Sequence, residues 1–343
     1  MTAGASEAEK LRSKRVHASV MMVLGAVMAA CALAAGLIAL RPGVFPSWMS
    51  GTWLRREPEP FRRPGEVLVR FVPWGPAALE RARVEDKLVL LHLTTSWSTA
   101  GRVMETTTYA DPQAAALLAA RFVSARVDAD ERPDLAARWG VGAWPSVVLL
   151  LPDGRAVAAA CALPPALFRA WAEAIADGLR RRPEKAVGLA ADAESRFAAV
   201  RARPPRDPAT LELDPVWGGA YRGGGDYAKT LADQAAVVAS ADAARAASAL
   251  GFAERFLALP GGGWAAAALG EVEQPDGRIA AGAYYFSLDD AGRRALGLPG
   301  LDRRFLPGPN ADLARAVLKS PVANDEQKVR ARRLLRKLWG RSP

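Results

Sequence analysis

Residues 94–105 read TTSWSTAGRVME, and this stretch decides how the first half of the chain folds. The run 87–93, KLVLLHL, stands directly before it. Continuous apolar runs of this length are typical of a central strand covered on both faces. From Ser98 onward the pattern predicts a tight turn and then a helix through Met104. The sequence therefore places a strand, a turn and a helix in direct succession.

Similar units lie on both sides of this stretch. Asp111 and Pro112 predict the start of a helix, with Asp111 as the cap and Pro112 in the first turn. Further helices are expected over 76–83 and 134–139, and strands over 122–127, 146–151 and 155–160. The resulting order is β-α-β-α-β-β, with parallel strands first and a hairpin last. This order predicts an α/β domain of the thioredoxin pattern.

Four motifs between residues 74 and 168 resemble the thioredoxin-like domain of the spermatogenesis-associated thioredoxin-like family, which is widespread in bacteria. They are the Val-Met-Glu that follows the turn, VDADERPD at 127–134, AWP at 143–145 and LPDG at 151–154. The resemblance implies a cis bond between Trp144 and Pro145, facing the turn beside Ser98. It also implies structural roles for four residues of the second motif: Asp128, Glu131, Arg132 and Asp134.

The turn itself departs from the family, whose members carry Cys-His-Trp-Cys-His at this point. Here the two cysteine positions are Ser98 and Gly101. Dithiol chemistry needs a thiolate of lowered pKa, which neither residue supplies. A serine nucleophile would need a base, and His92 has no assigned carboxylate partner. We therefore expect no catalytic residue here and interpret His92 as a core residue.

Three uses of the degenerate site stay open. The leading hypothesis is a groove that docks an extended peptide, formed by Trp97, Ser98, Trp144 and Pro145. The second is a domain that serves only as a packed spacer. The third is redox assistance through Cys161, although a small buried residue is the favoured interpretation of that cysteine. The first soluble domain is placed at 66–180.

The second half resembles the same family's helical domain, which is similar to six-hairpin glycosidases. The motifs are DPVWGG at 214–219, KTLADQA at 229–235 and AYYFSLDD at 283–290. The resemblance reaches residue 318 and implies a partial toroid over 181–323, without the family's acid at Ala228. No pair of carboxylates is evident for glycoside chemistry.

Within this half the sequence predicts three local features. Residues 229–259 are expected to form one bent helix or two halves, and residues 283–287 a short strand followed by a capped helix ending near Gly297. An incomplete toroid is expected to leave the apolar face of 229–257 open to a partner, unless the thioredoxin-like domain covers it.

The N-terminal region predicts a membrane anchor. The uncharged run 18–40 is long enough to span a bilayer, and the basic tail 1–17 before it predicts a cytoplasmic N-terminus. A proline-rich tether follows at 41–65. The expected location is a bacterial inner membrane with the bulk of the chain in the periplasm. A cleaved signal peptide, or a lipoprotein signal ending at Cys31, is the alternative.

The C-terminal segment 324–343 predicts a basic amphipathic helix. Its basic side could lie on anionic lipid, and the alternative is a docked helix with a solvated basic face. The candidate lipid contacts are Lys328, Arg332, Arg333, Arg336, Lys337 and Trp339.

Composition limits the remaining functions. The 343-residue chain has a net charge of +10 and only two histidines and two cysteines. Because basic residues are not interleaved with aromatic ones, we expect no nucleic-acid partner. No Cys/His spacing indicates a metal site, and the glycine runs lack the Lys and Ser/Thr of a phosphate loop, so no metal or cofactor is expected. The sequence predicts an accessory, docking or assembly subunit of a membrane complex, with membrane or periplasmic protein partners. The alternative is a thiol-disulfide or folding-assistance protein whose partner supplies the cysteines.

Overall fold

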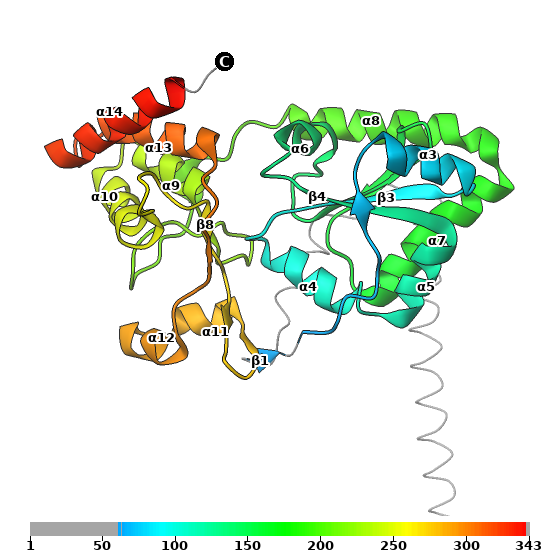
Figure 1. Ribbon diagram of the computed structural model, residues 1–343, viewed down its shortest axis with the longest axis horizontal. Coiled ribbons are helices and arrows are strands. Elements are labelled where there is room, and N and C mark those ends of the chain that lie inside the picture. Colours follow the sequence, from blue (N-terminus) through cyan, green and yellow to red (C-terminus); the bar gives the residue numbers. More distant parts are fainter. Residues whose placement is uncertain (1–60, 63, 341–343) are drawn as a thin grey trace, which may run out of the picture.

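The computed structural model describes residues 61–62 and 64–340. They form two packed units, one built on a five-stranded sheet and the other mainly helical with two small sheets (Figure 1). Within these described ranges no helix is long and apolar enough to cross a membrane. The predicted tail 1–17, the predicted span 18–40 and most of the predicted tether 41–65 lie outside the described residues.

The sheet of the first unit has the order β2-β4-β3-β5-β6. Strands β2 and β3 run parallel to β4, whereas β5 runs antiparallel to β3 and β6 antiparallel to β5. This arrangement confirms the predicted thioredoxin-like topology of parallel strands followed by a hairpin. The strands are β2 Val72–Pro73, β3 Leu88–Thr94, β4 Phe122–Asp128, β5 Ser146–Leu150 and β6 Ala156–Ala160.

Helices cover both faces of this sheet because alternate side chains of a strand point to opposite sides. On β3, Leu90 packs in a cluster with Trp171, and its neighbour Leu91 packs in the opposite cluster with Trp139. The first face is covered by α4 Thr99–Thr107, α5 Pro112–Arg121 and α7 Pro165–Arg181, and the second by α3 Pro76–Val84, α6 Pro133–Trp139 and α8 Ala186–Arg201. Helix α8 follows the short turn η1 Pro183–Lys185 and packs on β6. Because α8 lies beyond the domain boundary predicted at 180/181, the first unit extends further along the chain than predicted.

Two local predictions for this unit are confirmed. The Asp111 side chain accepts a hydrogen bond from the backbone N–H of Ala114 at 2.7 Å, so it caps α5 with Pro112 in the first turn. The peptide bond between Trp144 and Pro145 is cis.

The second unit packs four helices around one hydrophobic cluster. It also holds two three-stranded sheets, β1-β10-β9 and β11-β8-β7. The helices of the cluster are α9 Leu231–Val238, α10 Ala243–Phe252, α13 Pro307–Lys319 and α14 Asp325–Trp339. The remaining elements are β1 Phe61–Arg62, η2 Pro208–Thr210, β7 Lys229–Thr230, the π turn η3 Ala253–Leu257, β8 Ala267–Ala268, β9 Val272–Glu273, β10 Ile279–Ala280, α11 Gly282–Ser287, α12 Asp290–Leu296 and β11 Leu301–Asp302.

The alanine-rich region 229–259 forms two helices, and the prediction that its apolar face is open is wrong. The break falls at Asp242, whose side chain accepts from the N–H of Arg245 at 3.0 Å and thereby starts α10. Side chains from α9 and α10, such as Val237 and Leu250, are buried in the cluster that these helices share with α13 and α14. The apolar face is therefore satisfied within the second unit itself.

The strand predicted over 283–287 is also wrong, because these residues lie in helix α11. The buried residues of this segment are Ala281, Gly282, Tyr285 and Phe286. Their spacing of four residues matches one face of a helix and not the alternation of a strand. The predicted capped helix after it is confirmed, since Asp289 caps α12 by accepting from Gly292 N–H at 2.8 Å.

A buried ionic trio lies at the centre of this half. Asp214 accepts hydrogen bonds from Lys229 Nζ at 2.6 Å and from Arg293 at 2.7 Å, and all three side chains are almost fully buried. Burial lowers the pKa of Lys229 to about 8. The Lys229 ammonium also lies 4.3 Å from the ring centre of Phe252. The DPVWGG motif thus begins with a carboxylate that is shared by two buried cations.

Candidate functional site

The turn after β3 is organised around Ser98. Its side chain is fully buried, and its hydroxyl oxygen accepts a hydrogen bond from the backbone N–H of Gly101 at 3.0 Å. Ser98 is therefore the N-cap of α4, with the extended backbone typical of that position. At the first of the two predicted redox positions, the side chain now satisfies a helix terminus.

Gly101, the second of these positions, has no space for a side chain. A Cβ atom built on Gly101 would overlap the Thr94 hydroxyl at the end of β3. Even a cysteine side chain would need Thr94 to move. The structure around the turn is therefore fitted to serine and glycine, in addition to lacking sulfur.

The start of α4 is covered by the second unit. Asp226, from the loop before β7, accepts hydrogen bonds from the backbone N–H and the hydroxyl of Thr99, both at 3.1 Å. A carboxylate at a helix N-terminus is favoured by the positive end of the helix dipole. Burial raises the pKa of Asp226. This contact joins residues 127 positions apart in the sequence.

A second ionic contact lies one turn further along α4. Arg102 contacts the buried carboxylate of Glu271 at 2.9 Å and also donates to the backbone oxygen of Ser96 at 2.8 Å. Beside it, Gly270 approaches α4 so closely that a Cβ atom there would lie 3.0 Å from the Thr99 hydroxyl and 2.7 Å from the backbone nitrogen of Ala228. The two units are in van der Waals contact at this position.

Arg304 joins the units on the other side of the turn. It forms ion pairs with Asp302 of its own unit at 2.6 Å, and with Asp128 at 2.9 Å and Glu131 at 3.1 Å in the first unit. Ser96 donates a short hydrogen bond to Asp302. One guanidinium therefore neutralises carboxylates from both units around the end of β4.

Trp97 fills the space between these polar contacts. Its indole N–H donates to Asp130 at 3.0 Å, and its ring packs with Ala228 and Ala267 of the second unit. Burial, followed by repulsion from Asp128, raises the pKa of Asp130 to about 6. Since only 6% of the surface of Trp97 is exposed, the turn is closed to solvent on this side.

The predicted groove residues are brought together, and the chain itself occupies the surface they form. Trp97 and Trp144 belong to one cluster with side chains from the second unit, and Ser98 and Pro145 are buried. The docking hypothesis assumed that this surface is open. In the structure the second unit packs against this surface and contacts the first unit through Asp226, Glu271 and Arg304.

The four residues of the VDADERPD motif divide into two pairs with different environments. Asp128 and Glu131 contact Arg304 across the interface. Arg132 and Asp134 instead form an exposed ion pair with each other at 2.6 Å. Sequence reasoning found the motif but missed its partners in the second unit, because Asp302 and Arg304 carry no local motif of their own.

His92 lies apart from the turn in the core of the first unit. Its Nδ1 is 3.1 Å from the hydroxyl of Tyr109, and its Nε2 is 3.7 Å from the carboxylate of Glu105. Burial lowers the pKa of His92. With its side chain fully buried among aromatic rings, His92 is a core residue, as expected. Among the residues that the structure describes, no cluster of His, Cys, Asp or Glu is arranged to hold a metal ion.

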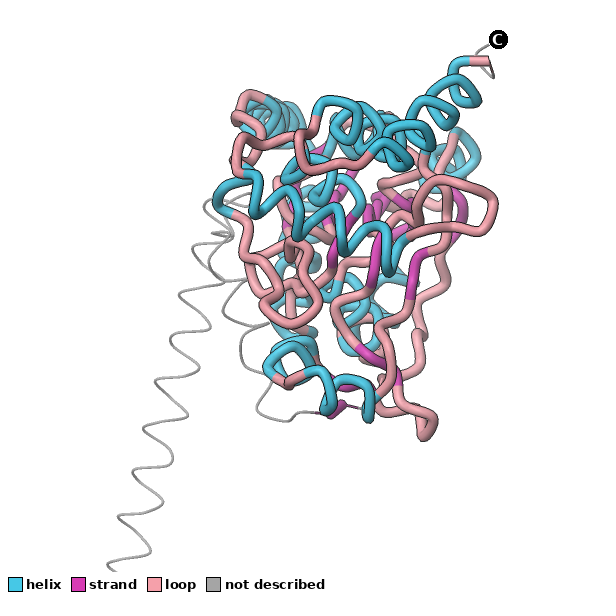
Figure 2. The backbone as a smooth tube through the Cα atoms, turned by 90° about the vertical axis from the view of Figure 1, so that its left-hand side faces the viewer, coloured by secondary structure: helices cyan, strands magenta, loops and turns pink. Residues whose placement is uncertain are grey.

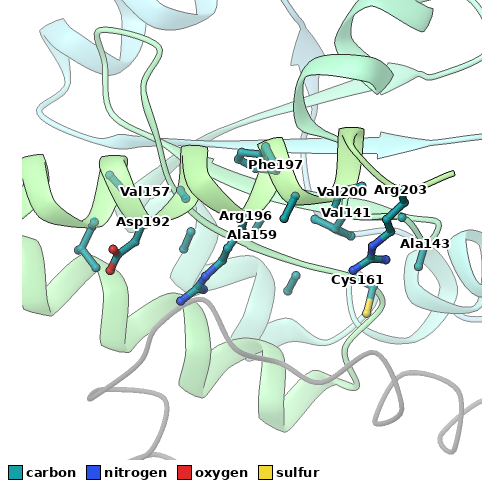
Figure 3. Close-up of a pocket in the computed structure, with 16 residues that line it drawn as sticks. Val141, Ala143, Val157, Ala159, Cys161, Asp192, Arg196, Phe197, Val200 and Arg203 are labelled. Atoms are coloured by element: carbon teal, nitrogen blue, oxygen red, sulfur yellow. The ribbon is translucent and has the colours of Figure 1, made fainter.

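Cys161 lies at the wall of a cavity of about 270 Å³ between α8 and the strand β6 (Figure 3). The cavity also has Arg196 and Arg203 in its lining, and the cysteine side chain is buried. Burial agrees with the interpretation of Cys161 as a small core residue.

The candidate lipid contacts lie on α14. Lys328 is half-buried, whereas Arg332, Arg333, Arg336, Lys337 and Trp339 are exposed. Ala331 and Leu334 dock the helix onto the rest of the second unit.

Comparisons with known proteins agree with the topology of the first unit. Residues 61–177 match the family Thioredox_DsbH, described as a protein of unknown function, DUF255. The uncharacterized protein B0495.5 of Caenorhabditis elegans is 30% identical over 105 residues, which are 28% of this chain and 14% of that protein. Human spermatogenesis-associated protein 20 is 33% identical over 93 residues, 25% of this chain and 12% of its own length. The chain thus spans only a small part of either relative.

Two solved structures each align with about a third of this chain. A thioredoxin from Thermus thermophilus is 30% identical and aligns with 34% of this chain and 89% of its own, with a TM-score of 0.28. A putative disulphide-isomerase from Bacteroides thetaiotaomicron is 24% identical and aligns with 33% and 96%, with a TM-score of 0.29. The match over residues 61–177 identifies the first unit as a thioredoxin-like domain of the DsbH/DUF255 family, with distant similarity to spermatogenesis-associated protein 20.

Proposed function

We propose that this protein is a non-catalytic accessory or assembly subunit, anchored in a bacterial inner membrane by residues 18–40 with its bulk in the periplasm. In this proposal the former redox surface of the thioredoxin-like domain holds the second unit in place. The two units then present one rigid body to membrane or periplasmic protein partners. The same proposal includes a second unit that is a partial six-hairpin toroid.

One observation carries this proposal. Ser98, at the position of a redox nucleophile, is fully buried and its hydroxyl oxygen caps α4. The helix N-terminus that would stabilise a thiolate is already occupied by the carboxylate of Asp226. A substrate disulfide would have to displace a salt-bridged domain contact before it reached this turn.

The test is a pair of thiol assays on the full chain in mild detergent. We expect no insulin reduction and no mixed disulfide with a trapping substrate. Restoring both cysteines, as Ser98→Cys with Gly101→Cys, should leave the protein inactive, because the second unit covers the turn and Gly101 lies against Thr94. Activity of the restored pair would contradict the proposal that the turn is closed.

Partner capture tests the accessory role. We expect the full chain to co-purify with stoichiometric protein partners from native membranes in mild detergent. Substitution of Cys161 by serine should leave this association unchanged. A chain that elutes alone from native membranes at endogenous expression would oppose the role as a subunit.

The second candidate is thiol-disulfide handling in which a partner supplies the cysteines. The observation that favours it is the position of Cys161 in a cavity beside Arg203, since cationic neighbours favour a thiolate. Mixed-disulfide trapping that disappears in the Cys161→Ser variant would support this candidate and overturn the first.

A further inference from the structure

A hollow separates helix α14 from the loop at 258–264. Two adjacent cavities of about 450 and 370 Å³ share much of its wall, including Leu259, Leu334 and Lys337. Gly261 and Gly262 also line both cavities, so no side chain from the tip of the loop closes them. The hollow is therefore a continuous feature of this end of the second unit.

The inner wall of the hollow is apolar. Leu334 is buried, and Phe305, Leu338 and Leu259 pack against the main hydrophobic cluster of the unit while still lining a cavity. Trp264 closes the wall at the base of the loop. A hydrocarbon chain placed here would remove apolar surface from water on both sides.

The rim of the hollow is basic. Arg333 and Lys337 are one helical turn apart on α14, so both side chains lie on the same face. Both are exposed, and within residues 64–340 neither has an ion-pair or hydrogen-bond partner for its side chain. Arg330 differs from them, because it pairs with Glu254 at 2.7 Å. The rim thus carries two cations that are free to bind an anion.

The surroundings suit the surface of a membrane. Helix α14 projects from one corner of the molecule (Figure 2). Trp339 near its end is 82% exposed, and tryptophan is enriched where headgroups meet water. Arg332 and Arg336 add positive charge to the same helix without lining either cavity.

We propose that this hollow binds an anionic phospholipid. Arg333 and Lys337 hold the phosphate of the headgroup, and part of one acyl chain lies against Leu334, Leu338 and Phe305. This site deepens the membrane association in the proposed function and rests on it. A free phosphate would satisfy the two cations but would leave the apolar wall uncovered, so the lipid fits both halves of the hollow.

The experiment uses the full chain in neutral detergent, with bound lipid counted by native mass spectrometry. The probes are short-chain phosphatidylglycerol, phosphatidylcholine of the same chain length, and inorganic phosphate. We expect Arg333→Gln with Lys337→Gln to weaken phosphatidylglycerol binding about 30-fold, because each cation near an anionic surface contributes about 1 kcal/mol. The matched control, Arg332→Gln with Arg336→Gln, removes the same charge outside the cavities and should weaken binding less than about threefold.

A third variant tests the apolar half without changing charge. No atom lies within 4 Å of a Cβ built on Gly261, so Gly261→Leu can be accommodated and should fill the hollow. We expect it to abolish phosphatidylglycerol binding. Equal weakening by both double variants, displacement of the lipid by millimolar inorganic phosphate, or equal binding of phosphatidylcholine would each overturn the proposal. These outcomes are independent of the thiol assays, so the site can fail while the non-catalytic role stands.

Discussion

The contact between the two units and the outer surface of α14 use charge in opposite ways. At the contact, Arg102 and Arg304 are half-buried and matched with carboxylates. On α14, Arg333 and Lys337 face solvent without a partner among the described residues. The comparison teaches that paired charges join parts of the chain to one another, whereas the exposed, unpaired charges on α14 are accessible from solvent.

The largest effect on stability is expected at the most deeply buried ion pairs, those of Asp214 with Lys229 and Arg293. Asp214→Ala leaves Lys229 and Arg293 buried without a counterion, and removing one partner of a buried ion pair costs about 3–5 kcal/mol. We expect a loss of this size in the free energy of unfolding, measured by urea denaturation with tryptophan fluorescence. The control is Asp312→Ala, which breaks an exposed pair with Arg315 and should cost less than about 1 kcal/mol. Equal losses would remove the distinction between covered and open charges.

A steric wedge tests the contact itself. Gly270→Ala adds a Cβ atom 3.0 Å from the hydroxyl of Thr99 across the contact and 2.7 Å from the backbone nitrogen of Ala228 in its own unit, and overpacking of this kind costs about 1–3 kcal/mol. We expect faster hydrogen exchange over 95–101, read by mass spectrometry. Gly308→Ala is the control, since no atom lies within 4 Å of its Cβ position. Unchanged exchange in the wedge variant would mean that the turn is protected by the first unit alone.

A pH series probes the edge of the contact. The pKa of Asp130 is raised to about 6, so between about pH 4 and pH 6 the folded protein binds more protons than the unfolded chain, and this carboxylate lowers stability as pH rises. Asp130→Asn keeps an oxygen for the indole of Trp97. We expect the variant to gain about 2 kcal/mol relative to wild type between pH 4.5 and pH 7 in urea denaturation.

The groups that face Asp130 are the same in both proteins, namely Asp128, Asp302 and Arg304. Asp134→Asn is the control, because its ion pair with Arg132 lowers the pKa of that carboxylate and the sign of its pH dependence is opposite. A gain that is the same at both pH values would show that the proton is not held by Asp130.

The smallest effect is expected on the open side of the comparison. Arg333→Gln with Lys337→Gln should change the free energy of unfolding by less than about 0.5 kcal/mol, because exposed side chains without partners contribute little to stability. The measurement is urea denaturation in the absence of lipid. A large loss would mean that these cations stabilise the fold and are not reserved for a ligand.

Local sequence signals were sufficient for the first unit up to α7, whereas α8 lies beyond the predicted boundary. The apolar run 87–93 predicts strand β3 and Asp111 predicts the start of α5, and both predictions are confirmed. Both depend only on residues that are neighbours in the sequence. The strand predicted over 283–287 is wrong because the tyrosines and the phenylalanine of this segment favour strands locally. Its conformation is decided by burial against Trp217 and Tyr227, which lie far away in the sequence.

The candidate site was only half predictable for the same reason. The two positions at which the resembling family carries cysteines are visible in the sequence as Ser98 and Gly101, and they predict a turn without a dithiol. Their cover is not visible, because Asp226 and Glu271 become partners of α4 only after the second unit has folded. An isolated aspartate after a glycine run has no periodicity that would mark it as a ligand for a helix terminus.

The pairing of β1 has a mechanical consequence. Phe61 and Arg62 precede the thioredoxin-like core in the sequence, yet they pair with Ile279 and Ala280 of the second unit. A pulling force applied at the N-terminal end of β1 is therefore borne first by a two-residue strand in the second unit. The load reaches the five-stranded sheet only after that strand detaches. The first contact to break under such a force therefore involves the second unit, although β1 precedes the thioredoxin-like core in the sequence.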